Sequence, residues 1–195
     1  MSRFLRYAVH PDNPQPRLLR HASDVIVAGG VAALPTANGY LLACRLDDKA
    51  AGTRLRRLAG QTDRDPAVLL CRDLAQAAVY LRIDDHAFRA IRNVQPDAGP
   101  WLLPCTKRVP RRLLTAGAMA RLCFAGEAAT QGLLGHIDEA LLLSPPAHGA
   151  ASVDRLPPLW RDGIDLALDV GPLAPRRCGT AADDVTDESP TLAAA

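Results

Sequence analysis

The sequence predicts an α/β fold, in which helices cover a mostly parallel or mixed sheet. Short apolar runs without polar alternation recur along the chain, which is typical of strands buried on both faces. Between them lie segments with apolar residues three and four positions apart, as in helices with one buried side. The chain has 195 residues and is 48% hydrophobic, which suits one domain with an ordinary core. Alternation of the two patterns favours the α/β class.

The first half of the chain is expected to form a strand, a helix, two strands and a second helix, over residues 3–9, 16–28, 31–34, 40–44 and 49–58. Gly29-Gly30 ends the first helix, because glycine adopts the left-handed conformation without a Cβ clash. Asn38-Gly39 is a tight-turn pair between the two strands. Asp47-Asp48 provides a cap for the second helix. These signals give each expected element a physical boundary.

The second half is expected to contain strands at 67–71, 101–105, 119–124, 140–143 and 166–170, helices at 73–80, 84–94, 127–134 and 153–161, and a helical turn at 110–114. The helix at 127–134 is expected to be weak and broken by Gly132 and Gly135. Pro157-Pro158 is expected to interrupt the last helix. We expect a single domain over 3–187 and a disordered tail at 188–195, because the end is rich in Pro, Ala and acids.

Composition excludes several classes of protein. No apolar run reaches about 18 residues, so we expect no transmembrane helix and no membrane partner. Arg3 and Arg6 bracket a very short apolar piece, unlike a signal peptide, which predicts a cytoplasmic location. The five cysteines are widely spaced without a C-x-x-C pair. A disulfide framework, a metal site and a catalytic thiol are therefore not predicted.

Positive charge is concentrated in two groups, although the formal net charge is only +2. The groups are Lys49, Arg54, Arg56, Arg57 and Arg64, and Lys107, Arg108, Arg111 and Arg112. Local basic clusters can mark a phosphate-rich ligand, but solvated helix faces have the same composition. Charge alone leaves both interpretations open. Acidic residues collect near the C-terminus, at Asp183, Asp184, Asp187 and Glu188.

Two further features have two interpretations each. Thr36 and Asn38 follow a buried strand, where the end of a strand in an α/β sheet often displays ligand contacts. The same residues also form ordinary structural turns. Trp101 could stack on a nucleic-acid base or fill the core. The residues by themselves do not decide between these alternatives.

Several motifs resemble those of the YrdC/YciO family, and more closely its YciO branch. The N-terminal motifs are His10–Leu19, Gly29-Gly30-Val31, Pro35-Thr36, Tyr40, Cys44 and Leu46–Ala50. The later ones are Leu69–Leu74, Gly99-Pro100, Thr106-Lys107, Val109–Leu114, Cys178-Gly179-Thr180 and Val185-x-Asp187. The resemblance runs from about Phe4 to Asp187 and is most specific in the first half.

The resemblance implies an open, twisted mixed sheet around a positively charged cleft. The family's known activity makes L-threonylcarbamoyladenylate from ATP, threonine and bicarbonate for tRNA modification. ATP with Mg²⁺ is the implied substrate complex, without a tightly bound cofactor, and tRNA or double-stranded RNA is the implied partner. The candidate nucleotide- or threonine-binding residues are Thr36, Tyr40, Arg64 and Ser144. The candidate RNA-binding residues are Arg54, Arg57, Lys107, Arg108, Arg111 and Arg112. No residue is assigned as catalytic.

The chain departs from the family pattern where charged or amide ligands are expected. Ala59-Gly60-Gln61 occupies the Lys-x-Arg positions, Pro146-Ala147-His148 the Ser-x-Asn positions, and Phe124 the place of an arginine. Each charge-assisted contact is worth roughly 1.5–3 kcal/mol. The first hypothesis is therefore a protein that binds RNA or a nucleotide and has weak or lost synthase activity. An active synthase with substituted ligands and a structural or interaction protein are the alternatives. The sequence predicts no oligomeric state.

Overall fold

A computed structural model describes residues 4–62, 64–93, 100–115 and 117–174. Its strands are β1 Leu5–Ala8, β2 Ala32–Thr36, β3 Gly39–Arg45, β4 Ala67–Cys71, β5 Trp101–Pro104, β6 Met119–Phe124, β7 Leu141–Leu143 and β8 Leu166–Asp169. They form one eight-stranded sheet in the order β1-β8-β2-β3-β7-β4-β6-β5. Strands β1, β8 and β2 are parallel, as are β4 and β6, whereas β7 is antiparallel to both β3 and β4. The prediction of an α/β fold with a mixed sheet is confirmed.

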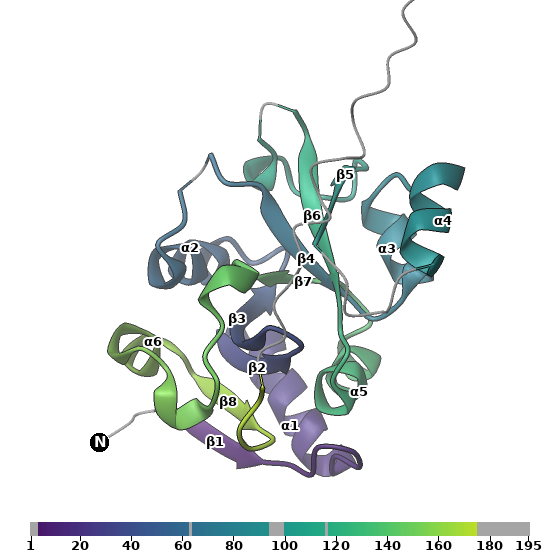
Figure 1. Ribbon diagram of the computed structural model, residues 1–195. Coiled ribbons are helices and arrows are strands. Elements are labelled where there is room, and N and C mark those ends of the chain that lie inside the picture. The colour runs from purple at the N-terminus through teal and green to yellow at the C-terminus, as the bar shows by residue number, and fades with distance from the viewer. Residues whose placement is uncertain (1–3, 63, 94–99, 116, 175–195) are drawn as a thin grey trace, which may run out of the picture.

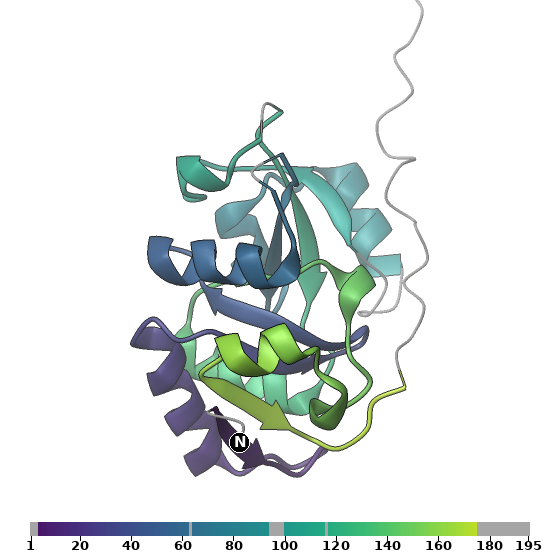
Figure 2. The ribbon, with the colours of Figure 1, turned by 90° about the vertical axis from the view of Figure 1, so that its left-hand side faces the viewer.

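Helices cover both faces of this strongly twisted sheet (Figures 1 and 2). They are α1 Pro16–Val27, α2 Lys49–Ala59, α3 Leu74–Tyr80, α4 Asp85–Asn93, α5 Ala128–Ile137 and α6 Pro158–Gly163. The described residues also form three 3₁₀ turns: η1 Arg111–Leu113 between β5 and β6, and η2 Pro146–His148 and η3 Val153–Arg155 between β7 and α6. Buried residues of α2, α3, α4 and α6 belong to one apolar cluster, and those of α1 and α5 to another. We call these two sides of the sheet the first face and the second face.

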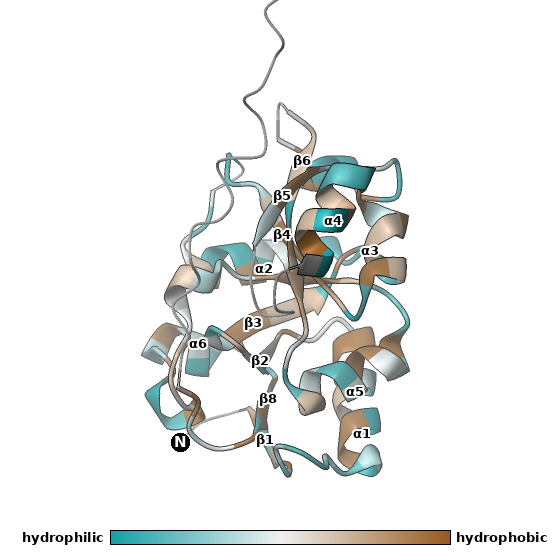
Figure 3. Cartoon of the chain, turned by 45° about the vertical axis from the view of Figure 1, so that its right-hand side comes forward, coloured by the Kyte–Doolittle hydropathy of each residue, from teal (hydrophilic) through white to brown (hydrophobic). Residues whose placement is uncertain are grey.

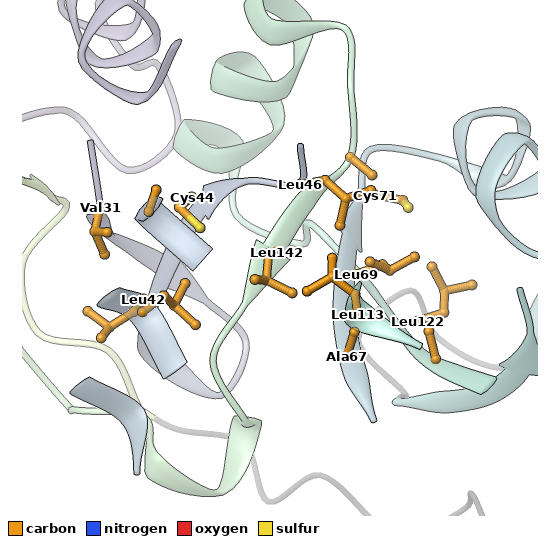
Figure 4. Close-up of a cluster of buried hydrophobic side chains, with 14 of the residues drawn as sticks. Val31, Leu42, Cys44, Leu46, Ala67, Leu69, Cys71, Leu113, Leu122 and Leu142 are labelled. Carbon is orange, nitrogen blue, oxygen red and sulfur yellow. The ribbon is translucent and has the colours of Figure 1, made fainter. Parts of the chain in front are cut away.

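The core follows from the period of two along each strand. In β3, Leu42 and Cys44 belong to the first face, whereas Leu41 and Ala43 belong to the second. Figure 4 shows the first-face cluster, in which Leu42, Leu142 and Leu69 come from three strands that are neighbours in the sheet. Figure 3 shows hydrophilic residues on the helices alongside hydrophobic ones that line the sheet. The inner strands β2, β3, β4, β7 and β8 are therefore buried on both sides, as the uninterrupted apolar runs predict, whereas β1 at one margin of the sheet is largely exposed.

The helix ends have local causes that the sequence contains. Pro16 occupies the first turn of α1, where a missing N–H costs nothing. The Asp48 side chain accepts the Ala51 N–H at 2.9 Å, and Asp73 accepts the Gln76 N–H at 2.8 Å. Gly60 ends α2 in the left-handed region, with φ of 66°. These caps fix where the chain enters and leaves the helices of the first face.

The structure corrects two details of the expected elements. Helix α5 is not broken at Gly132 but continues to Ile137. The missing side chain lets α1 approach, because a Cβ on Gly132 would lie 2.6 Å from Leu19 Cδ1. The expected helix at 153–161 is the short turn η3 followed by α6, with Pro157 preceding α6. The proposed tail at 188–195 and the end of the 3–187 domain lie outside the described residues.

None of the described helices combines the length and the apolar character that crossing a membrane requires.

Candidate functional site

The β2–β3 turn holds the first candidate, Thr36, in a closed arrangement. Its Oγ1 donates to the Gly39 carbonyl at 2.6 Å and accepts the Asn38 N–H at 3.2 Å. Gly39 has φ of 92°, and a Cβ there would lie 2.6 Å from the Ala150 carbonyl oxygen. The turn is thus packed against the segment after η2. Because Thr36 is buried and its hydroxyl is bonded within the turn, the structural interpretation has direct support.

Tyr40, the second candidate, is fully buried at the start of β3. Its hydroxyl oxygen accepts the Val170 N–H at 2.9 Å and lies 2.7 Å from the Gly171 carbonyl oxygen, to which it donates. Asp169 Oδ1 lies 3.2 Å away. Desolvation by burial raises the pKa of Tyr40 well above its usual value. The hydroxyl therefore fastens β3 to the end of β8.

A charged network surrounds this hydroxyl, and sequence reasoning missed it. Arg6 Nε donates to Asp169 Oδ2 at 2.7 Å, and Arg6 Nη1 donates to Asp154 Oδ1 at 2.7 Å. The bonds to Arg6 lower the pKa of Asp154. Residues 6 and 169 are 163 positions apart. No local motif connects them, so no signal in the sequence indicated the pair.

Ser144 and Arg64 lie at the same end of the central strands as Thr36 and Tyr40. We call this end, where β2 and β7 finish and β3 and β4 begin, the sheet edge. Ser144 directly follows β7 and is buried; its Oγ accepts the Leu42 N–H at 3.0 Å. Arg64 precedes β4 in an exposed loop, where its backbone N–H donates to Thr62 Oγ1 at 3.3 Å. The structure therefore brings the four candidates to one edge. Three of them are buried and bonded to backbone groups, and Arg64 alone of the four is exposed.

Arg54, a candidate for RNA binding, makes a structural ion pair. Its Nη2 donates to Asp165 Oδ2 and, at 3.3 Å, to the Gly29 carbonyl oxygen. Asp165 Oδ2 also accepts the Val31 N–H at 2.8 Å. This arrangement joins α2 to the chain that enters β2 and β8. Asp165 is a second charged partner that the sequence did not indicate.

The other candidates for RNA binding are exposed on the first-face side. Arg57 lies in the last turn of α2, and four further cations follow β5, at Lys107, Arg108, Arg111 and Arg112. We call these five residues the basic surface. The segment that carries four of them is anchored by Val109 and Leu113, which are 2% and 5% exposed within the first-face core. Apolar side chains therefore hold the segment while its four cationic residues stay exposed.

Two hydrogen bonds place this segment among its neighbours. Arg112 Nη2 donates to the Leu46 carbonyl oxygen at 2.8 Å, next to the start of α2. Thr106 Oγ1 donates to the Val79 carbonyl oxygen at 2.7 Å, which ties the segment to α3. Burial raises the pKa of the Cys44 thiol to about 12, while the positive charges of Arg54 and Arg112 act in the opposite direction. The α2 and β5–β6 basic groups, separate in sequence, thus meet around the end of β3.

The positions that depart from the family pattern have structural uses. Gly60 is the left-handed cap of α2, and Pro146–His148 forms the turn η2. The Phe124 ring makes an edge contact with buried Trp101 at 5.7 Å between centroids. Trp101 thus belongs to the core. Across the described ranges no three His, Cys, Asp or Glu residues gather into a group that could hold a metal ion.

Comparison with known proteins identifies relatives of this chain. The Sua5/YciO/YrdC family model, described as "Telomere recombination", matches residues 24–145. The Escherichia coli K12 protein named "Uncharacterized protein YciO" is 42% identical over 114 residues, which are 58% of this chain and 54% of that protein. A threonylcarbamoyl-AMP synthase of Halorhodospira halophila is 31% identical over 102 residues, 52% of this chain and 53% of that enzyme. The chain thus spans about half the length of the curated relatives it matches.

Solved structures agree on the fold. The crystal structure of E. coli YciO superposes with a TM-score of 0.77 at 33% identity, covering 89% of this chain and 86% of that one. The crystal structure of P. abyssi Sua5 complexed with L-threonine superposes with a TM-score of 0.76 at 18% identity, covering 87% of this chain and 51% of that one. At that identity the second likeness shows the fold alone. Because the family model matches more than half of the residues and the E. coli YciO structure covers most of the chain, this protein belongs to the Sua5/YciO/YrdC family.

Proposed function

We propose that this chain binds RNA, either tRNA or double-stranded RNA, through the basic surface, with threonylcarbamoyl-AMP synthase activity weak or lost. The observation that carries the proposal is the exposed, anchored cation group at Lys107, Arg108, Arg111 and Arg112. Cations on a fixed frame can neutralise several phosphates at once and release the bound counterions. Arg57 of α2 adds a fifth exposed cation on the same face.

Weak or lost synthase chemistry is supported by the uses of the expected ligand residues. Thr36, Tyr40 and Ser144 are buried and bonded to backbone groups. Phe124, where the family resemblance places an arginine, makes an aromatic contact instead of offering a charge. Adenylation builds negative charge on the transferring phosphoryl group, which needs cations or donors at fixed positions. Among the four candidate ligand residues, Arg64 is the one cation left to meet that charge.

The salt dependence of RNA affinity tests the binding part of the proposal. We expect the affinity of the full chain for a structured RNA to fall steeply with salt. The logarithm of the affinity should fall against the logarithm of the salt concentration with a slope of roughly 0.9 per phosphate contact. Lys107→Ala/Arg108→Ala should weaken binding and reduce the slope by about two. The matched control is Arg17→Ala/Arg20→Ala, which removes two exposed cations from α1 on the second face. An equal loss of RNA affinity in the two double variants would contradict binding through the basic surface.

Pyrophosphate release tests the chemistry. The purified protein is incubated with ATP, threonine, bicarbonate and Mg²⁺, and compared with its Arg64→Ala variant. Background release in both supports weak or lost activity. Clear turnover that disappears in the variant would support an active synthase with substituted ligands and would contradict that part of the proposal. A protein that neither turns over nor binds ATP or RNA would instead be a structural or interaction protein.

A further inference from the structure

One aromatic ring on the first-face side is open to solvent. The chain has three Phe, three Tyr and two Trp, all within the described residues. Phe88 on α4 is 41% exposed, whereas the other aromatic side chains are buried or half-buried. The exposed part of this ring is open to contact with a ligand.

The neighbours of Phe88 are mostly cationic. Asp85, Phe88, Arg89 and Arg92 recur at helical spacing and are all exposed, so they share one side of α4, while Ala87 and Ile91 face the core. The Arg92 guanidinium carbon lies 5.5 Å from the Phe88 ring centroid. The ring and the guanidinium together present two flat surfaces. Flat aromatic and guanidinium groups are the groups on which unpaired nucleic-acid bases stack.

Two backbone hydrogen bonds tie the end of α3, which precedes α4 in the chain, to the segment that carries Lys107 and Arg108. The Arg82 N–H donates to the Pro104 carbonyl oxygen, and the Thr106 N–H donates to the Tyr80 carbonyl oxygen, both at 2.8 Å. Lys107 and Arg108 follow Thr106 directly. Exposed Arg82 lies between α3 and α4 in the chain and adds a further cation at this connection. Asp84 and Asp85 oppose this charge, but Asp84 caps α4 by accepting the Ala87 N–H at 2.8 Å.

We propose that Phe88 and Arg92 form a stacking site for an unpaired base of the RNA whose phosphates bind the basic surface. The inference rests on the proposed function and refines it. A continuous duplex hides its bases in the stack, so a stacking site favours an RNA with a bulge or loop. The basic surface supplies affinity without sequence preference, and Phe88 supplies the preference for an unpaired nucleotide.

The test uses two RNA hairpins with the same stem, one fully paired and one with a single bulged 2-aminopurine. Stacking on one aromatic side chain strengthens binding by about 5- to 150-fold. We expect the wild-type protein to bind the bulged hairpin more tightly by a factor in this range and to quench the 2-aminopurine fluorescence. Phe88→Leu should remove both effects without changing affinity for the paired hairpin. Phe88→Trp should keep them.

The matched control is Leu159→Ala, which truncates a 58% exposed apolar side chain on α6. It should leave the preference for the bulge intact. Equal wild-type affinity for the two hairpins, or a preference that survives Phe88→Leu, overturns the stacking site. Salt-dependent binding that still requires Lys107 and Arg108 would leave the proposed function standing in that case. Failure of the wild-type protein to bind either hairpin would overturn both.

Discussion

The sheet edge around Thr36 and the basic surface both carry side chains that resemble ligand contacts, but the structure uses them in opposite ways. At the edge, the hydroxyls of Thr36 and Tyr40 are buried and bonded to the protein. On the basic surface, Lys107 and Arg108 are exposed on a segment fixed by buried apolar residues. The difference teaches that residue type is a weaker guide to binding than burial and existing hydrogen bonds. Changes at the edge should alter stability, and changes on the surface should alter affinity.

The largest expected effect is that of Gly39→Ala in the β2–β3 turn. The left-handed backbone costs roughly 1–3 kcal/mol for a residue with a Cβ. The new methyl group would also lie 2.6 Å from the Ala150 carbonyl oxygen. Urea unfolding measures the loss. The control is Gly135→Ala in α5, where a Cβ meets nothing within 4 Å, and which should stabilise by up to about 1 kcal/mol. An equal change in unfolding free energy for the two variants would contradict the assignment of the turn as a rigid element.

Tyr40→Phe should sharpen the comparison, because it removes only one oxygen atom. The variant leaves the partly buried Val170 N–H without its acceptor. An unpaired buried group costs about 1–3 kcal/mol of unfolding free energy, and partial exposure places this loss near the lower figure. Urea unfolding should show this loss, while RNA affinity stays unchanged. Tyr7→Phe on β1, where the ring is half-buried, is the control and should change stability little. A fall in RNA affinity with intact stability would assign Tyr40 to a binding site instead.

Asp73 provides a smaller effect that depends on pH. The Gln76 N–H and the Arg72 side chain hold the pKa of this carboxyl below its usual value. A lowered pKa in the folded state means that the stabilisation is present above the usual pKa and is lost as pH falls through the folded one. Asp73→Asn keeps the cap but removes the charge, worth about 0.3–1 kcal/mol at low salt. The variant should be less stable than wild type at pH 6, and the difference in unfolding free energy should close as the pH falls through the lowered pKa of folded Asp73.

The measurement is the unfolding free energy of both proteins across that pH range. A constant difference would show that Asp73 acts through geometry and not through its charge.

Arg57→Ala should have the smallest effect on stability, because exposed substitutions usually stay within about 0.5 kcal/mol. It should weaken RNA binding and reduce the salt slope by about one. Arg20→Ala on α1 removes a matched exposed cation from the second face and should change neither quantity. Fluorescence anisotropy at several salt concentrations measures the slope. If Arg57→Ala destabilised the protein without affecting RNA binding, Arg57 would have a structural role, like the buried residues at the sheet edge.

Much of the fold could be predicted from the sequence, because apolar periodicity and capping residues act locally. The strand at 67–71 was predicted with its observed bounds, and helix α2 begins after the expected cap Asp48. Helix α5 was predicted too short because two glycines in sequence do not show what packs against them. At Gly132 that neighbour is Leu19, more than a hundred residues away. Local propensity was overridden there by tertiary packing.

The candidate site was harder to predict for the same reason. The motif residues Thr36, Tyr40 and Ser144 could be found, but their hydrogen-bond partners could not, because these depend on sheet register. The pairing of Arg54 with Asp165 joins residues 111 positions apart. Phe88 was read as part of an expected helix, and nothing in the spacing said that its ring would be exposed. Trp101 had two interpretations, and burial against Phe124 decided for the core.

The position of β8 also orders events during protein synthesis. This late strand lies between β1 and β2, and the parallel pairing joins Leu5 to Leu166. A ribosome therefore releases β1 long before its strand neighbour β8. Closing so long a loop costs entropy before any pairing energy is gained, and folds dominated by such distant contacts form slowly. Until residue 169 has emerged, the nascent chain carries the unpaired edges of β1 and β2, the stage at which it is most open to wrong pairing.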